Sequence, residues 1–265
     1  MINEKKDVDT DIPLVILAGG LGTRMGNLTQ DIPKPMLEIN GLPIIFHIMA
    51  HYAKYGVRQF HILAGYKSAY IKDYFSRLAF NVSSVSFTYS KSGDTSVECL
   101  QDSWGVSDWC VSVHETGFNS ETGERLRRIK NRLPKEFYFT YGDGLSDFDP
   151  TQGLVRLRQS GAVAVLCAIT KKERFGNLVL SDEGSVIEFQ EKNSNQDTWI
   201  NGGYMCISDS IFDYINGSND SFEAHVLPRI SDANKLCAVK HGGFWKALDH
   251  EREIAEMNIE LSNYG

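Results

Sequence analysis

The sequence lacks the features that mark several broad classes of protein. No apolar run approaches the length of about 20 residues that a membrane-spanning helix needs. The opening stretch, MINEKKDVDTD, is too polar for a signal peptide. Positive charge is scarce, because 27 Lys and Arg stand against 34 Asp and Glu and give a formal net charge of −7. We therefore expect a cytoplasmic protein with no membrane and no nucleic-acid partner, since a sequence-independent grip on nucleic acid needs a basic face.

Cysteine is sparse and shows no pairing pattern. The chain has five cysteines, an odd number, and no two of them form a CxxC motif. This usage is typical of reduced and mostly buried thiols in a cytosolic protein, and it argues against a zinc site.

Apolar runs that resemble strands alternate with helical runs along most of the chain. The alternation predicts an α/β fold with a Rossmann-like arrangement, in which helices flank a mixed, mostly parallel central sheet. After about residue 170 the pattern changes to a hairpin that turns at residues 182–184, which adds a small C-terminal β/α portion. We expect residues 1–11 to form a polar N-terminal extension and residues 12–265 to form a single domain. The expected strands cover residues 13–18, 58–65, 85–90, 109–116, 136–144, 162–170 and 198–208, and the expected helices cover 43–56, 68–80 and 151–160.

A glycine-rich stretch, LAGGLGTRMGNLTQDIPKPM at residues 17–36, follows the first apolar run. Clustered glycines let backbone amides come close to a ligand. The spacing fits neither a dinucleotide fingerprint, whose third glycine position is Met25, nor a P-loop. It fits a longer loop around a triphosphate, in which amides of residues 19–22 approach phosphate oxygens. Arg24 would bind a phosphate, and Lys34 is oriented by the flanking prolines. A plain surface turn is the alternative.

Two aspartates follow apolar runs and are candidate metal ligands. Asp143 comes directly after the run 137–141 and stands between two glycines, and Asp249 follows FWKAL. Two carboxylates at separate strand ends suit one Mg²⁺, which prefers a few carboxylates together with phosphate oxygens. The alternative for each is a solvated or helix-capping aspartate, and Asp249 precedes a stretch, EREIAEMN, that is typical of a helix start.

Taken together, these motifs resemble the nucleotidyltransferases that join a sugar 1-phosphate to a nucleoside triphosphate. The opening signature LAGGLGTRM…PKPM is similar to that of the whole family. The stretches ETGFNSETGERLRRI, FYFTYGDGLSDFD, FQEK and INGGY are similar, in this order, to its glucose-1-phosphate cytidylyltransferase branch. The resemblance covers residues 13–258. It implies a nucleotidyltransferase fold, Mg²⁺ as cofactor, transfer of CMP from CTP with release of pyrophosphate, and a homo-oligomer.

The resemblance and the motifs together give a set of expected site residues. Lys34, Arg24 and Asp143 are the expected catalytic residues, and Asp143 and Asp249 the expected metal ligands. A phosphorylated acceptor is expected to contact the FQEK and INGGY stretches. The expected nucleotide-binding residues are Leu17, Ala18, Gly19, Gly20, Gly22, Thr23, Arg24, Lys34, Thr116, Gly117, Tyr141, Gly142 and Asp143. The expected acceptor-binding residues are Gly144, Glu191, Lys192, Asn201, Gly203 and Glu223.

Several positions depart from the family pattern on the acceptor side. His225 and Val226 stand where the family tends to have Glu-Pro, and Lys246 stands where Gln is usual. These departures leave open an acceptor that is not glucose 1-phosphate, including a phosphorylated metabolite that is not a sugar, and Lys246 would suit an acidic one. A different nucleoside triphosphate, a glycosyltransferase and a non-catalytic nucleotide-sugar sensor are further alternatives. The segment 115–129 is expected to form a lid or subunit contact, or simply an exposed helix with a Glu124–Arg128 pair.

Overall fold

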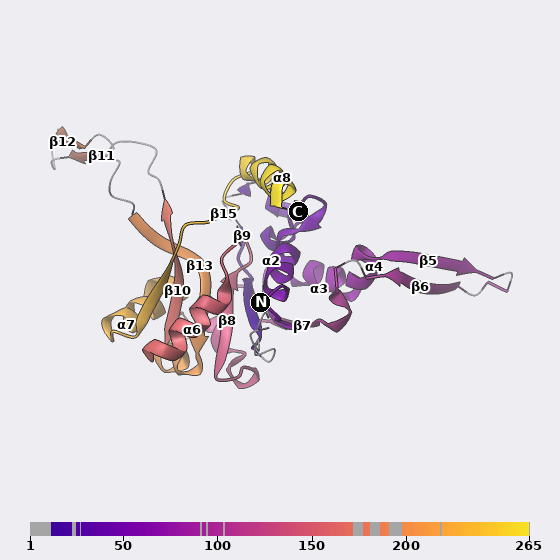
Figure 1. Ribbon diagram of the computed structural model, residues 1–265, viewed down its shortest axis with the longest axis horizontal. Helices are drawn as coiled ribbons and strands as arrows, with labels where there is room; N and C mark the ends of the chain where they lie inside the picture. Colours follow the sequence, from indigo (N-terminus) through magenta and orange to yellow (C-terminus); the bar gives the residue numbers. More distant parts are fainter. Residues whose placement is uncertain are drawn as a thin grey trace, which may run out of the picture.

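The computed structural model describes residues 12–22, 25–26, 28–90, 92–93, 95–102, 104–171, 177–180, 186–190, 198–217 and 219–264. A seven-stranded sheet forms the centre of the molecule (Figure 1). β13 runs antiparallel to both of its neighbours, and the other strands are parallel to one another. The expected mixed, mostly parallel sheet is therefore confirmed. In spatial order the strands are β14 (Leu236–His241), β10 (Ala164–Lys171), β13 (Thr198–Ser208), β8 (Glu136–Tyr141), β1 (Leu14–Ala18), β4 (Gln59–Ala64) and β7 (Cys110–Glu115).

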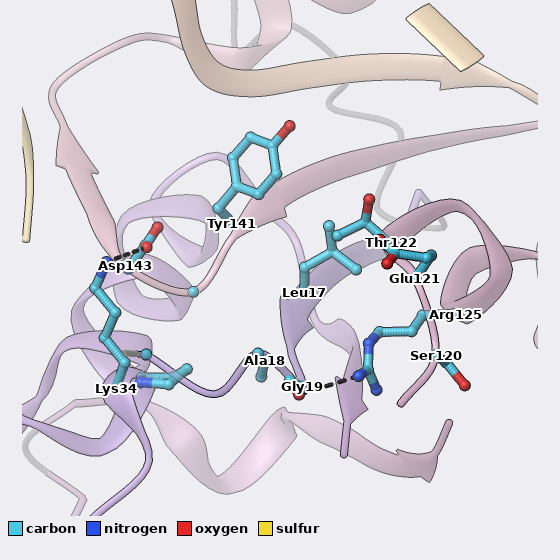
Figure 2. Close-up of a pocket in the computed structure, with 14 residues that line it drawn as sticks. Leu17, Ala18, Gly19, Lys34, Ser120, Glu121, Thr122, Arg125, Tyr141 and Asp143 are labelled. Atoms are coloured by element: carbon cyan, nitrogen blue, oxygen red, sulfur yellow. Dashed lines mark hydrogen bonds and ion pairs between the residues drawn. The ribbon is translucent and has the colours of Figure 1, made fainter. Parts of the chain in front are cut away.

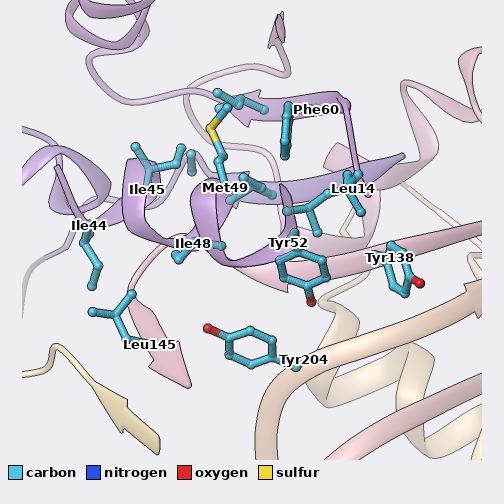
Figure 3. Close-up of a cluster of buried hydrophobic side chains, with 14 of the residues drawn as sticks. Leu14, Ile44, Ile45, Ile48, Met49, Tyr52, Phe60, Tyr138, Leu145 and Tyr204 are labelled. Atoms are coloured by element: carbon cyan, nitrogen blue, oxygen red, sulfur yellow. The ribbon is translucent and has the colours of Figure 1, made fainter. Parts of the chain in front are cut away.

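Both faces of the sheet are buried. Because successive side chains of a strand point to opposite faces, Leu14 and Ile16 of β1 belong to one hydrophobic cluster, whereas Val15 and Leu17 belong to another. Helices α2 and α6 pack on the first face, while α5 and α7 pack on the second. Figure 3 shows the first cluster around α2. The helices are α1 (Leu28–Asp31), α2 (Ile44–Ala53), α3 (Ser68–Ser76), α4 (Leu78–Val82), α5 (Thr122–Arg127), α6 (Pro150–Ser160), α7 (Leu227–Asp232) and α8 (Arg252–Tyr264).

Two local features differ from the expectation. The helix expected over 68–80 is divided at Arg77, whose φ of −119° leaves the helical region and separates α3 from α4. An antiparallel ribbon of β5 (Ser84–Tyr89) and β6 (Thr95–Gln101) projects from the body (Figure 1). β6 had no sequence signal of its own, because it pairs only with β5 and its side chains are not sorted between a core and a solvent face.

Short ladders outside the main sheet position the functional residues. β9 (Gly144–Ser146) pairs antiparallel with β15 (Trp245–Ala247), so that a segment directly after β8 lies beside one near the C-terminus. β2 (Glu38–Ile39) pairs with β3 (Leu42–Pro43). The expected hairpin is formed by β11 (Asn177–Leu180) and β12 (Val186–Gln190), and its turn at 182–184 lies outside the described residues. Short 3-10 turns cover Lys34–Met36, Val106–Asp108, Lys130–Arg132 and Asp209–Tyr214, and a π-helical turn covers Phe222–Val226.

The remaining expectations concern the N-terminal extension, the number of domains, the burial of the cysteines and membrane-spanning helices. The extension 1–11 lies outside the described residues, and the single-domain organisation stays a prediction. Cys167 and Cys206 are buried as expected, but Cys99 and Cys110 are exposed, because they lie on the ribbon and on an edge strand rather than inside the core. No helix within the described ranges is both long and apolar enough to cross a membrane.

Candidate active site

A cavity lies at the carboxyl ends of β1 and β8, where ligands bind in open α/β sheets. It has a volume of about 390 Å³. Side chains from the first loop, from α5 and from the end of β8 surround it (Figure 2). The lining residues are Leu17, Ala18, Gly19, Gly20, Gly22, Lys34, Pro35, Ser120, Glu121, Thr122, Arg125, Tyr141, Gly142 and Asp143.

The glycines of the cavity wall allow close backbone packing. The Gly142 amide donates a 2.9 Å hydrogen bond to the Leu17 carbonyl, which joins the ends of β8 and β1. A Cβ on Gly142 would lie 2.9 Å from that same oxygen. Gly22 has a φ of +65°, a conformation that favours glycine. The glycine-rich loop therefore forms one wall of the cavity as a backbone surface.

Arg125 of α5 connects the ends of neighbouring strands at the cavity by hydrogen bonds. Its side chain is almost completely buried and donates hydrogen bonds to the carbonyls of Gly19 (3.0 Å) and Gly117 (2.7 Å) and to the Thr116 hydroxyl (2.7 Å). Burial, and then the nearby charge of Arg128, lower the pKa of Arg125. Thr116 and Gly117 were expected to bind the nucleotide directly. They do not line the cavity but support the guanidinium that does.

Lys34 brings the two expected metal ligands together. Its Nζ lies 2.6 Å from Asp143 Oδ2 and 3.3 Å from Asp249 Oδ1. The backbone fixes this arrangement, because the Leu248 amide donates a 2.8 Å bond to the Asp143 carbonyl and the β9–β15 ladder aligns the flanking residues. The two carboxylates thus converge on the Lys34 ammonium, and their role as metal ligands stays a prediction.

Asp143 and Asp249 form a candidate magnesium site. Among the described residues there is no group of three or more His, Cys, Asp or Glu side chains that could hold a metal. Two carboxylates alone fit Mg²⁺, which often takes one or two carboxylates and completes its shell with water and substrate phosphates. Both carboxylates contact the Lys34 ammonium, so Asp143 and Asp249 lie close enough together to bind one positively charged group. The donor set therefore fits the expected ion.

A smaller cavity of about 70 Å³ adjoins the first and shares Tyr141 and Asp143 with it. Three of the expected acceptor-binding residues, Gly144, Asn201 and Gly203, line this cavity. The pairing of β10 with β13 shifts register here, so that Gly202 and Gly203 lie at an irregularity of β13. The residues that line the smaller cavity are Thr140, Tyr141, Asp143, Gly144, Asn201, Gly202, Gly203, Tyr204, Trp245 and Ala247.

The Tyr141 side chain separates the two cavities. Its ring packs so closely against Gly203, which has a φ of +82°, that a Cβ there would lie 2.7 Å from Tyr141 Cδ2. The hydroxyl lies near Glu223 and Asn201, and burial, followed by the charge of Glu223, raises its pKa. Gly203 is therefore explained by the tyrosine ring as well as by the cavity.

Glu223 lines neither cavity but contacts Thr122, which lines the larger one, and its expected role in acceptor binding stays a prediction. The Thr122 hydroxyl donates a 2.8 Å hydrogen bond to Glu223 Oε2 and accepts a 2.7 Å bond from the Phe222 amide. The start of α5 is thus attached to the π-helical turn 222–226. Ser120, Glu121, Thr122 and Arg125 of the segment 115–129 line the larger cavity, and the lid or subunit contact stays a prediction. The expected Glu124–Arg128 pair exists, although Glu124 is buried rather than exposed.

The acidic-acceptor role suggested for Lys246 is not supported by its placement. Its ammonium forms an ion pair with Glu256 of α8. The neighbouring residues Trp245 and Ala247 line the smaller cavity, so the alternation of a strand turns Lys246 away from it. The side chain that broke the family pattern anchors the C-terminal helix.

Most of the expected nucleotide-binding residues within the described ranges line the larger cavity. Thr122 and Arg125, from the glycine-punctuated, polar stretch 115–129, line it as well. Pro35, Ser120 and Glu121 also line it, but the sequence gave no signal for them. Thr23, Arg24, Glu191 and Lys192 lie outside the described residues, and their roles stay predictions.

Comparisons with known proteins show the family and the fold. Residues 14–249 match the model of the family described as "Nucleotidyl transferase". The chain is 37% identical over 241 residues to the glucose-1-phosphate cytidylyltransferase of Salmonella typhi, covering 90% of this chain and 91% of that protein. These findings confirm the resemblance expected from the motifs.

Solved structures show the same fold at low sequence identity. HddC from Yersinia pseudotuberculosis, complexed with GMP-PN, matches with a TM-score of 0.66 and 21% identity, covering 94% of this chain and 99% of that chain. The inositol-1-phosphate CTP transferase from T. maritima matches with a TM-score of 0.62 and 14% identity, covering 94% and 96%. The chain therefore has the Rossmann-like fold of nucleotidyltransferases.

Proposed function

Because the chain belongs to the nucleotidyl transferase family, we propose that it transfers CMP from CTP to a sugar 1-phosphate such as glucose 1-phosphate, releasing pyrophosphate. One observation carries the proposal. A cation, Lys34, and two carboxylates meet at the boundary between a nucleotide-sized cavity and a smaller one. This is the arrangement that two anionic substrates need in order to meet.

The reaction requires alignment and charge neutralisation more than covalent catalysis. A phosphate oxygen of the acceptor attacks the α-phosphorus of CTP, and pyrophosphate leaves in line. The backbone wall of Gly19, Gly20 and Gly22 would hold the triphosphate, and Lys34 would stabilise the charge that develops on it. Arg24 on the triphosphate, Lys192 on the acceptor phosphate and Glu191 on acceptor hydroxyls belong to the same proposal.

Asp143 and Asp249 would hold the Mg²⁺. When bound, the ion neutralises phosphate charge and orients the triphosphate. Asp143 also lines the smaller cavity, so the carboxylate pair lies where the transferred group passes between the substrates. Tyr141, in the wall between the two cavities, would exclude water from that path.

The choice of CTP and of a sugar phosphate rests on the relative named glucose-1-phosphate cytidylyltransferase. Another nucleoside triphosphate or a phosphorylated metabolite that is not a sugar is a competing substrate. Purified protein is mixed with Mg²⁺, a triphosphate and an acceptor, and pyrophosphate is measured. We expect release with CTP and glucose 1-phosphate. Release only with another pair corrects the substrates, and no release with any pair rejects catalysis.

Location and assembly complete the proposal. The five unpaired cysteines fit a reducing cytoplasm, and the product would be a nucleotide sugar used for polysaccharide synthesis. Fractionation of cells tests the location. The homo-oligomer stays a prediction, and sedimentation velocity of the purified chain measures it directly.

A further inference from the structure

Lys34 occupies the position between the two carboxylates that a metal ion would share. Its Nζ donates hydrogen bonds to Asp143 Oδ2 (2.6 Å) and Asp249 Oδ1 (3.3 Å), as Figure 2 shows for Asp143. The lysine side chain is only 12% exposed, whereas those of Asp143 and Asp249 are 33% and 40% exposed. In this structure the ammonium is therefore the counter-ion of the pair.

The local backbone conformation fixes the position of Lys34. Pro33 and Pro35 flank it, and the 3-10 turn Lys34–Met36 places it at the cavity floor. Both carboxylates are held by the Leu248–Asp143 backbone bond and the β9–β15 ladder. The Lys34 ammonium and the two carboxylates are thus preorganised beside one another.

A divalent cation would have to compete with this ammonium. Two positive groups within a few ångströms of the same oxygens repel each other strongly in a partly buried site. A triphosphate changes this competition. When it binds in the cavity that Lys34 lines, its phosphate oxygens are new partners for the ammonium. Once Lys34 turns to a phosphate, its ammonium no longer occupies the position between the two carboxylates.

We propose that Lys34 has a second role in the nucleotide-free protein: it closes the Asp143–Asp249 pair to divalent metal, so that the metal enters only together with the triphosphate. This inference rests on the proposed function, since it takes the two aspartates as the metal ligands. Because binding couplings are reciprocal, bound metal and bound triphosphate each favour the other.

The test uses Mn²⁺ as the probe and measures its binding to nucleotide-free protein by electron paramagnetic resonance. Lys34→Met removes the ammonium, Lys34→Gln is a second variant that keeps hydrogen bonding, and Lys54→Met is the control because it removes one exposed lysine at the end of α2. We expect roughly tenfold tighter Mn²⁺ binding to both Lys34 variants than to wild type or the control. Adding Asp143→Asn to Lys34→Met should abolish the gain.

Two results would overturn the inference. One is wild-type protein that binds Mn²⁺ as tightly as the Lys34 variants. The other is a gain that survives in the Lys34→Met/Asp143→Asn protein, since the ion would then bind elsewhere. If pyrophosphate is released in the activity assay while either result is obtained, only the closing role of Lys34 fails. If no substrate pair gives pyrophosphate, the proposed function itself fails.

Discussion

The guanidinium of Arg125 donates a 3.0 Å hydrogen bond to the carbonyl of Gly19, although the two residues are 106 positions apart in the chain. Figure 2 shows this bond at the edge of the nucleotide cavity. The same guanidinium reaches the ends of β4 and β7 through Ala64 and Gly117. One buried side chain therefore sets the spacing of the strand ends that form the cavity.

Gly19→Ala should disturb this arrangement, whereas Gly20→Ala should not. A Cβ on Gly19 would lie 2.3 Å from Arg125 Nη1, but a Cβ on Gly20 meets nothing within 4 Å. Crowding of this kind costs about 1–3 kcal/mol, and the displaced guanidinium would leave carbonyls without donors. Urea unfolding measures the loss. Equal stability of the two variants would show that Arg125 can move without cost.

Thr122→Val should weaken the attachment of α5 to the turn 222–226. The change keeps the shape but removes one donated and one accepted hydrogen bond, with Glu223 and the Phe222 amide. We expect a loss of about 1–3 kcal/mol of stability and a higher KM for CTP, because Thr122 lines the cavity. Thr122→Ser keeps the hydroxyl and should restore both. A normal KM in the valine variant would contradict the proposed lid.

The histidine pair on β4 and β7 should make the protein less stable in acid. His61 Nδ1 lies 2.9 Å from His114 Nε2, and burial, then His114 and Arg132, lower the pKa of His61 to about 4. The unfolded chain binds a proton at this histidine near pH 6.5, whereas the folded protein binds it only near pH 4. Stability is therefore lost as pH falls from about 6.5 towards 4.

His61→Gln should reduce this pH dependence. Between pH 7 and pH 4.5 we expect the variant to lose about 1–2 kcal/mol less stability than wild type, measured by urea unfolding at both values. His250→Gln is the control because His250 is exposed and distant in sequence from the pair. A wild-type slope in the His61 variant would assign the acid sensitivity to other groups.

Lys246→Gln should leave acceptor preference unchanged. The side chain forms an ion pair with Glu256 and points away from the smaller cavity, which Trp245 and Ala247 line. The ratio of kcat/KM for an acidic and a neutral acceptor phosphate should match that of wild type. A change in that ratio by about tenfold or more would restore Lys246 as a specificity residue.

Much of the fold could be predicted because the pattern of apolar residues carries it. Alternating strands and helices require a parallel sheet buried on both faces, and β1 distributes Leu14 and Val15 to opposite clusters as that pattern demands. β5 of the projecting ribbon was predicted, but β6 was not, since it pairs with a single strand and lacks a buried face. The break at Arg77 depends on local backbone geometry that a helical period does not reveal.

The sequence by itself determined the parts of the site that are local: the glycine-rich loop after β1, Lys34 between two prolines, and Asp143 directly after β8. Their positions follow from the chain's own neighbours. Only the tertiary structure decided that Asp249 lies beside Asp143, that Arg125 supports Gly19, and that Lys246 turns to Glu256. These relations depend on strand register and helix packing between distant segments, which the residue types alone do not specify.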